Sequence, residues 1–118
     1  MSVSAAAVRK LALAFPEATE QPHHDLTSFR VRGKIFATVP PDGEHLHVFL
    51  DEPEAAAWVS EHPDGYELLR WGKRVSGLRV TLGRAPDDQV RELLEESWHR
   101  RAPKRLAAER DQTRPGPG

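Results

Sequence analysis

Residues 28–39, "SFRVRGKIFATV", carry the pattern that decides the fold of this chain. Apolar and polar residues alternate on both sides of Arg32-Gly33, which is typical of two antiparallel strands joined by a tight turn. Basic residues stand at every second position from Arg30 to Lys34, with Phe29 and Phe36 on either side. The stretch therefore predicts a β-hairpin, and it raises the question of whether the basic side of that hairpin binds a ligand.

The hairpin can form in two registers. A two-residue loop at Arg32-Gly33 would mix apolar and charged side chains on both faces. A three-residue loop that starts at Val31, with Gly33 in a left-handed bulge, pairs Phe29 with Ile35 and separates the two kinds of side chain. One face would then hold Thr27, Phe29, Ile35, Ala37 and Val39, and the other Ser28, Arg30, Lys34, Phe36 and Thr38. Because a slip of one residue inverts the faces of a strand, we predict the bulged register.

Similar patterns predict the other strands. Residues 19–24 fit a short edge strand, because Pro22 cannot donate a hydrogen bond in a central one. Residues 45–50, "HLHVFL", alternate apolar and polar positions, and residues 66–71 and 78–82 form a second strand pair around "GKRVSG".

Three helices are predicted from apolar residues at helical spacing. The first spans residues 4–14 and ends before Pro16. The second begins after Asp51, which we expect to cap the helix in a capping-box arrangement with Glu54. The last begins near Asp87, buries a stripe of Val90, Leu93, Leu94 and Trp98, and is broken or kinked by Pro103.

The elements follow in the order helix, three or four strands, helix, two strands, helix. Strands with one aliphatic and one polar face are typical of an antiparallel sheet covered by helices on a single side. We therefore predict an α+β fold, a two-layer sandwich with an antiparallel sheet of about five strands and helices on one face. A single domain is expected over residues 1–109, and residues 110–118, "RDQTRPGPG", are expected to form a disordered tail.

Composition narrows the class of protein. The chain has 118 residues, a net charge of −1 and no cysteine, which excludes disulfides and thiolate zinc sites. Its N-terminal apolar run is interrupted by Arg9 and Lys10, is too short to span a bilayer and lacks the pattern of a signal peptide. We expect a cytoplasmic protein with no membrane partner.

The charges are arranged in blocks. Residues 42–67 hold eight acidic residues and no Lys or Arg, whereas residues 68–84 hold five basic residues and no acid. Such blocks can place opposite charges on different faces of a fold, or they can neutralise each other across the sheet. The near-zero net charge argues against a protein that coats nucleic acid by charge alone.

Several of these segments together resemble the MmcQ/YjbR family. The similar segments are the first helix ending in "FP", the hairpin "FRVRGKIFAT", the acidic helix start "DEPEAAAWV" and the last helix "DDQVRELLEESWHRRAPKRLAA". The resemblance covers about residues 4–108 and implies a two-layer domain of the order α-β-β-β-α-β-β-α, similar to secretion chaperones and described as a double wing. Members of the family are often labelled DNA-binding because of their fold, and no catalytic residues can be carried over from them.

The open face of the sheet is the candidate nucleic-acid interface. Aromatic side chains on an uncovered sheet can stack on splayed bases while cations hold the phosphates. The candidate binding residues on the face and on the basic turn near Trp71 are Arg30, Lys34, Phe36, His47, Phe49, Arg70, Lys73, Arg74 and Arg79. The expected partner is DNA or RNA.

Other interpretations of the same residues remain open. Phe36 and Phe49 can pack together or be buried in a homodimer or against another protein, and in the alternative register Phe36 lies in the core. The turn near Lys73 and the histidines at His23, His24, His45 and His47 can simply be solvated. No catalytic, phosphate-binding or metal-binding motif is present, so we expect no enzymatic activity, no metal and no cofactor.

Overall fold

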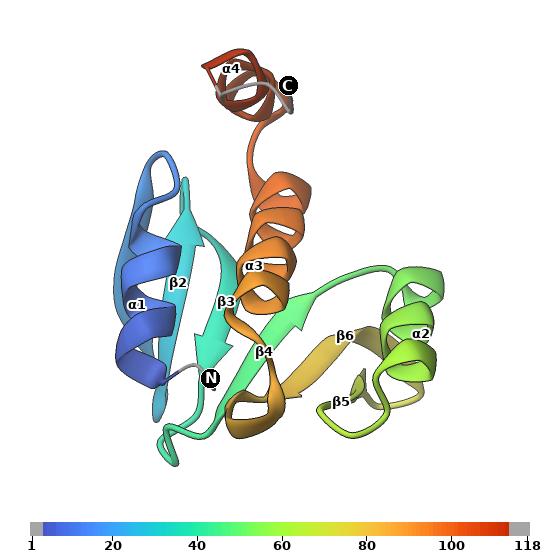
Figure 1. The fold of residues 1–118 in the computed structure, drawn as a ribbon. Helices are drawn as coiled ribbons and strands as arrows, with labels where there is room; N and C mark the ends of the chain where they lie inside the picture. Colours follow the sequence, from blue (N-terminus) through green and yellow to red (C-terminus); the bar gives the residue numbers. More distant parts are fainter. Residues whose placement is uncertain (1–3, 114–118) are drawn as a thin grey trace.

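The computed structural model describes residues 4–113, which form one antiparallel sheet with helices packed on one of its faces (Figure 1). The strands are β1 (Ala18–His23), β2 (Leu26–Val31), β3 (Lys34–Val39), β4 (His45–Phe49), β5 (Tyr66–Trp71) and β6 (Arg74–Thr81). Their order in the sheet is β1-β2-β3-β4-β6-β5. The helices are α1 (Ala5–Leu13), α2 (Glu52–Glu61), α3 (Asp87–Arg101) and α4 (Lys104–Thr113), with a 3-10 turn η1 at Leu82–Arg84. The predicted α+β class and antiparallel sheet are confirmed, with six strands.

The helices divide the sheet between them. Helix α1 packs beside β1, α3 lies across β3 and β4, and α2 lies over β5 and β6 (Figure 1). None of the helices in residues 4–113 is long and apolar enough to cross a membrane. The face turned away from α1, α2 and α3 is called the open face below.

The helix ends agree with the sequence in some places and differ in others. The Ser4 side chain accepts a hydrogen bond from the N–H of Ala7 at 3.1 Å, as an N-cap does. Asp51 makes no such cap bond, because its carboxylate is paired with Arg100 on α3 instead, so the predicted capping box is wrong. The break at Pro103 is confirmed, but α4 continues to Thr113, past the boundary predicted at residue 109. Residues 114–118 of the predicted tail lie outside the described residues.

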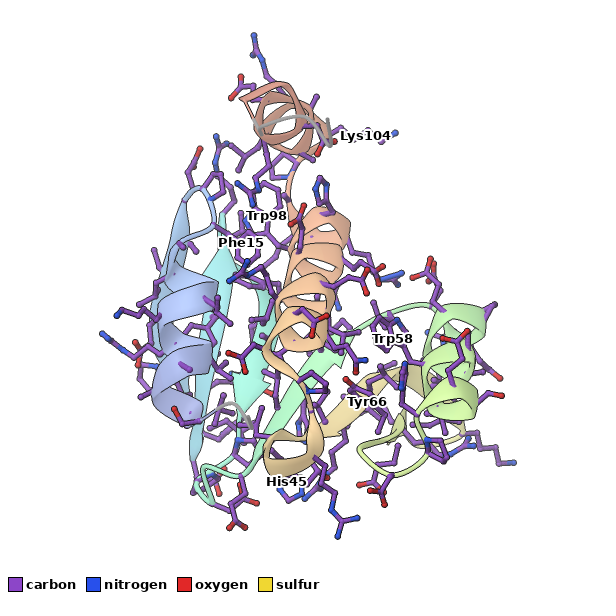
Figure 2. All side chains as sticks on the ribbon, viewed as in Figure 1. Phe15, His45, Trp58, Tyr66, Trp98 and Lys104 are labelled. Carbon is purple, nitrogen blue, oxygen red and sulfur yellow. The ribbon has the colours of Figure 1, made fainter. Side chains whose placement is uncertain are left out.

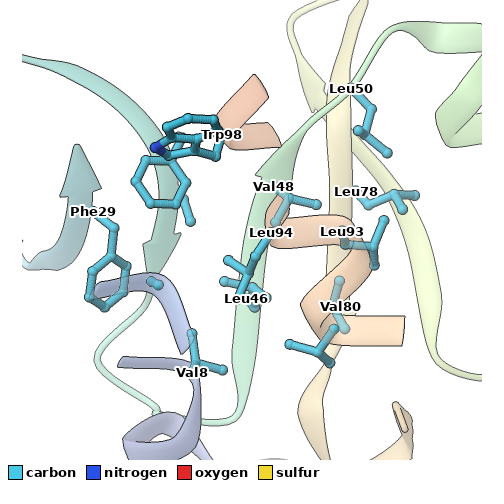
Figure 3. Packing of buried hydrophobic residues seen from close by; sticks show 14 of the residues in the cluster. Val8, Phe29, Leu46, Val48, Leu50, Leu78, Val80, Leu93, Leu94 and Trp98 are labelled. Atoms are coloured by element: carbon cyan, nitrogen blue, oxygen red, sulfur yellow. The ribbon is translucent and has the colours of Figure 1, made fainter. Parts of the chain in front are cut away.

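The core is built around Trp98, the largest fully buried side chain (Figure 3). Its ring stacks on Phe15 with centroids 5.9 Å apart, and its indole N–H donates to the carbonyl of Pro16 at 3.1 Å (Figure 2). Phe36 meets Phe15 edge to face at 6.2 Å. Buried aromatic groups with a satisfied N–H contribute strongly to stability, so this contact fixes α3 on the sheet.

A second aromatic cluster anchors α2. Trp58 meets Tyr66, at the start of β5, with ring centroids 5.5 Å apart (Figure 2). The Tyr66 hydroxyl donates to Gln89 on α3 at 2.5 Å, and burial raises the pKa of this tyrosine to about 12. The cluster therefore covers the start of β5, and the strand continues beyond it.

The β2–β3 hairpin does not adopt the register that we predicted. Its turn is the two-residue Arg32-Gly33, with φ of 51° and 82°, and Val31 pairs with Lys34. Positive φ at both turn residues is the type I′ geometry that suits a twisted hairpin. Arg32 is held in this conformation at the surface, where its guanidinium is paired with Glu17.

The apolar pattern is restored by a bulge inside the strands instead of at the turn. Arg30 pairs with Ile35, Phe29 pairs with Ala37, and Phe36 is the extra residue. Such a bulge lets two successive residues point toward the same side. Phe36 is therefore 0% exposed in the core, while Ile35, predicted in the core, is half-buried.

Ser97 on α3 explains why the bulge occurs at Phe36. Strands β3 and β4 are paired only at Ala37–Val48 and Thr38–His47 and then separate. The Ser97 hydroxyl fills the gap by donating to the carbonyl of Phe36 and accepting the N–H of Phe49 at 2.9 Å. Both groups would otherwise be unpaired in the interior, so a side chain from α3 completes the ladder.

Candidate nucleic-acid interface

A row of polar residues crosses the open face through all six strands. Strand pairing places its members directly opposite one another in the order Gln21, Ser28, Thr38, His47, Arg79, Glu67. The Ser28 hydroxyl donates to the carbonyl of Gln21 at 2.7 Å, so the first part of the row is tied to the backbone. Two of the predicted residues, His47 and Arg79, are thus neighbours at the centre of the face.

His47 is partly enclosed by this row. Its Nδ1 lies 3.4 Å from the Thr38 hydroxyl, and its Nε2 is buried without a hydrogen-bond partner among the described residues. Burial lowers the pKa of His47 below its usual 6.5, and the positive charge of Arg79 lowers it further. His47 is consequently neutral at neutral pH and contributes a polar rather than a charged surface.

Arg79 is only partly neutralised. Its Nε lies 3.4 Å from a carboxylate oxygen of Glu67, at an angle that does not make a hydrogen bond, and both side chains reach solvent. An exposed pair of this kind contributes little to stability and leaves the guanidinium able to meet another anion.

Fewer side chains of the β2–β3 hairpin are available on the open face than the sequence predicted. Phe36 is absent from the open face because it lies in the core. Arg30 is half-buried and donates to the Ser28 hydroxyl at 3.1 Å, while Lys34 is exposed at the turn. The prediction that this hairpin places an aromatic ring on the open face is therefore wrong.

Phe49 lies at the end of β4 and is half-buried. The guanidinium of Arg101, on α3, lies over its ring at 5.0 Å from the centroid. This cation–π contact covers one face of the ring, so Phe49 is less available for stacking than the sequence suggested.

The tip of the β5–β6 hairpin is the most exposed part of the interface. We call Arg70, Trp71, Lys73 and Arg74 the basic tip. Trp71 pairs with Arg74 across the two-residue turn Gly72-Lys73, and it is 82% exposed. Gly72 has a φ of 64°, as the first turn position of a type II′ hairpin requires. Arg70, Lys73 and Arg74 are exposed, and within the described residues no acid pairs with them.

A sequence model of the YjbR family matches residues 13–100. The chain belongs to the YjbR family. A solved structure of a Deinococcus radiodurans protein with the DUF419 domain is similar to this YjbR domain, with a TM-score of 0.68 and 20% identity over 79% of this chain and 74% of that one. At this identity the likeness shows the fold alone. No curated protein matches the chain.

Sequence reasoning missed two residues of this YjbR domain that shape the interface. Ser97 and Arg101 follow Val90 and Leu94 at helical spacing on α3, so they lie on its buried stripe. The periodicity could have placed them toward the sheet. Neither was among the candidate binding residues, although a hydroxyl or guanidinium on such a stripe must find a partner.

The helical side of the YjbR domain carries the opposite charge. A cavity of about 710 Å³ between α2, α3 and α4 is lined by Asp51, Glu54, Asp88, Arg91, Glu92, Glu95, Glu96, His99, Arg100 and Asp111. Burial raises the pKa of Glu96, and its neighbours Glu92 and Glu54 raise it further. Acidic side chains, most of them on α3, are thus concentrated at this cavity, whereas the ion pairs of Asp64 with Arg84 and of Glu67 with Arg79 join the acidic block of the sequence to the basic one. Among the described residues, no group of three or more His, Asp or Glu could hold a metal ion.

Proposed function

We propose that this YjbR domain binds nucleic acid through the basic tip and the adjoining part of the open face. The observation that supports the proposal is Trp71, a large aromatic side chain that is 82% exposed between cations with no acidic partner among the described residues. Exposed aromatic groups beside cations are the usual means of holding bases and phosphates together. The proposal assigns a binding role and no catalytic one.

The distribution of charge favours a polyanion at this place. Arg79 lies on the open face two residues before the end of β6, and Arg70, Lys73 and Arg74 lie at the tip. The acidic cavity lies on the helical side, where it repels phosphates. A polyanion that approaches the domain is therefore directed toward the sheet and away from α3.

The proposal is tested by titrating a labelled oligonucleotide at several salt concentrations, from about 50 to 300 mM. Binding should weaken as salt rises, because phosphate contacts release counterions. The Lys73→Glu variant should weaken binding several-fold and reduce the salt slope by about one. Affinity that is independent of salt would end the proposal.

Lys34→Glu is the matched control. Lys34 is also an exposed lysine next to a glycine-containing hairpin turn, but β4 and β6 lie between its strand and β5. The two variants change the net charge equally, so nonspecific electrostatics affects them alike. If Lys34→Glu weakens binding as much as Lys73→Glu, the basic tip is not the contact surface.

A second candidate function is the binding of a protein or a second copy at the outer edge of β5. Within residues 4–113 no strand pairs with this edge, and β5 contains no proline, whereas the opposite edge strand, β1, is interrupted by Pro22. Unprotected edges are places where another strand can be added. Light scattering at micromolar concentration tests this: a strict monomer that also captures no protein contradicts it.

A further inference from the structure

We infer that the nucleic acid this domain takes is single-stranded, with an unpaired base stacked on Trp71. The inference rests on the proposed function and names the ligand class of the same site. It follows from how Trp71, Leu69, Gly77 and Phe49 are placed, which together are called the stacking strip below.

Trp71 lies at the end of the strip, on a paired strand. It is a strand residue that pairs with Arg74 directly across the hairpin, next to the two-residue turn. Residues that alternate along a strand share a face, so Trp71 lies on the same side as Leu69 and Glu67, the latter at the end of the polar row. The ring is thus held on the open-face side of the sheet instead of on a mobile loop.

The strip has a glycine in the row next to Trp71. Strand pairing places Gly77 between Leu69 on β5 and Phe49 on β4, so the middle of this row has no side chain. A side chain cannot be accommodated there, because a Cβ on Gly77 would lie 1.9 Å from the carbonyl oxygen of Val48. Gly77 is itself buried, so its neighbours close over this point, and Trp71 is the part of the strip that a base can reach.

Cations surround the strip at positions that suit a backbone passing over it. Lys73 and Arg74 lie at the tip, and Arg79 lies two residues beyond Gly77, whereas Arg101 reaches the ring of Phe49 from α3. Because that ring face is already occupied, Phe49 is not a stacking platform. Trp71 is consequently the main stacking platform, and the cations meet the phosphates on either side of the bases.

The flat base faces that this strip can recognise are hidden in a duplex. In double-stranded DNA or RNA each base is stacked on its neighbours, and a tryptophan reaches it only by unstacking a base step. A single strand exposes its bases without that cost. Phosphate contacts alone would not discriminate between single-stranded and double-stranded nucleic acid, so Trp71 is the residue that distinguishes them.

The experiment compares two probes of equal length, a labelled oligothymidylate and a thymidine–adenosine duplex, with the wild type, Trp71→Ala and Trp71→Phe. We expect the single strand to bind at least about tenfold more tightly than the duplex. Trp71→Ala should lose roughly 5- to 150-fold affinity for the single strand with an unchanged salt slope. Trp71→Phe should retain part of the affinity, because a smaller ring still stacks.

Tryptophan fluorescence gives an independent readout. Trp98 is fully buried and Trp58 is half-buried, so quenching by a stacked base should come from Trp71 and disappear in Trp71→Phe. Quenching that persists in this variant contradicts stacking on Trp71. The thermal midpoint reports whether each variant folds.

The failures of the two proposals are distinguishable. If the duplex binds as well as the single strand, if Trp71→Ala leaves the affinity unchanged, or if quenching on binding persists in Trp71→Phe, the single-strand inference is wrong and the proposed function stands. If neither probe binds, both are wrong.

Discussion

The hairpins β2–β3 and β5–β6 have similar local sequences but different environments. Each has a two-residue turn that includes a glycine with a positive φ, and each carries a nearby lysine, an aromatic ring and further cations. In β2–β3 the ring of Phe36 is 0% exposed and Arg32 is paired with Glu17. In β5–β6 the ring of Trp71 is 82% exposed, and no acid pairs with the basic tip among the described residues.

The helical layer explains the difference. Helix α3 lies across β3 (Figure 1), so the ring of Phe36 enters the core, where it meets Phe15, the ring that stacks on Trp98. Helix α2 contacts β5 through Trp58 and Tyr66, at the strand's beginning, and the tip extends beyond that contact. The same kind of local sequence is thus structural under one helix and available for binding beyond another.

Replacing the two rings is the strongest test of this contrast. Phe36→Ala should lower the free energy of unfolding by about 3–5 kcal/mol, because it removes a fully buried ring. Trp71→Ala should change it by less than about 0.5 kcal/mol, as expected for an exposed side chain. Chemical denaturation of both variants measures this, and comparable losses would show that the hairpins are not different in the way proposed.

The second test concerns the bond network that sets the first hairpin apart. Ser97→Ala leaves the carbonyl of Phe36 and the N–H of Phe49 unpaired in the interior, at a cost of about 1–3 kcal/mol for each group. Ser60→Ala, at an exposed position on α2, should be close to neutral and serves as control. A Ser97→Ala variant as stable as the control would mean that the gap between β3 and β4 is closed in another way.

The same bond network shows where prediction from the sequence reaches its limit. Strands and helices follow from local periodicity, and the alternation in residues 45–50 correctly placed Leu46 and Val48 in the core. The register of the β2–β3 hairpin does not follow from local periodicity, because the bulge at Phe36 depends on Ser97, 61 residues further along the chain. Both candidate registers gave each residue one fixed face, and neither included a bulge within the strand.

Glycine-to-alanine substitution should lower stability equally in the two turns, in contrast to the different effects of replacing Phe36 and Trp71. A Cβ at Gly33 or Gly72 would meet nothing within 4 Å, so substitution costs only the strain of φ values of 82° and 64°. Gly33→Ala and Gly72→Ala should each lower stability by about 1–2 kcal/mol. Thermal melts check this, and a much larger loss at one turn would indicate that the turns themselves differ, not only the helices that cover the strands.

The smallest expected effect is the pH dependence of stability that comes from His47 on β4, the strand between the two hairpins. The pKa of His47 is below 6.5 in the folded domain, so the unfolded chain binds more protons just below that pH. Stability should therefore decrease as pH falls below about 6.5 and level off below the folded-state pKa. Arg79 and His45 favour the neutral form, whereas Asp42 and Glu67 oppose it.

His47→Gln should remove this part of the pH dependence. Urea denaturation at about pH 7.5 and pH 5.5 should show a smaller difference for the variant than for the wild type. His24→Gln, at an exposed position, should behave as the wild type does. An NMR titration midpoint for His47 above 6.5 would contradict the prediction and would mean that the ring binds its proton more tightly than the buried environment beside Arg79 allows.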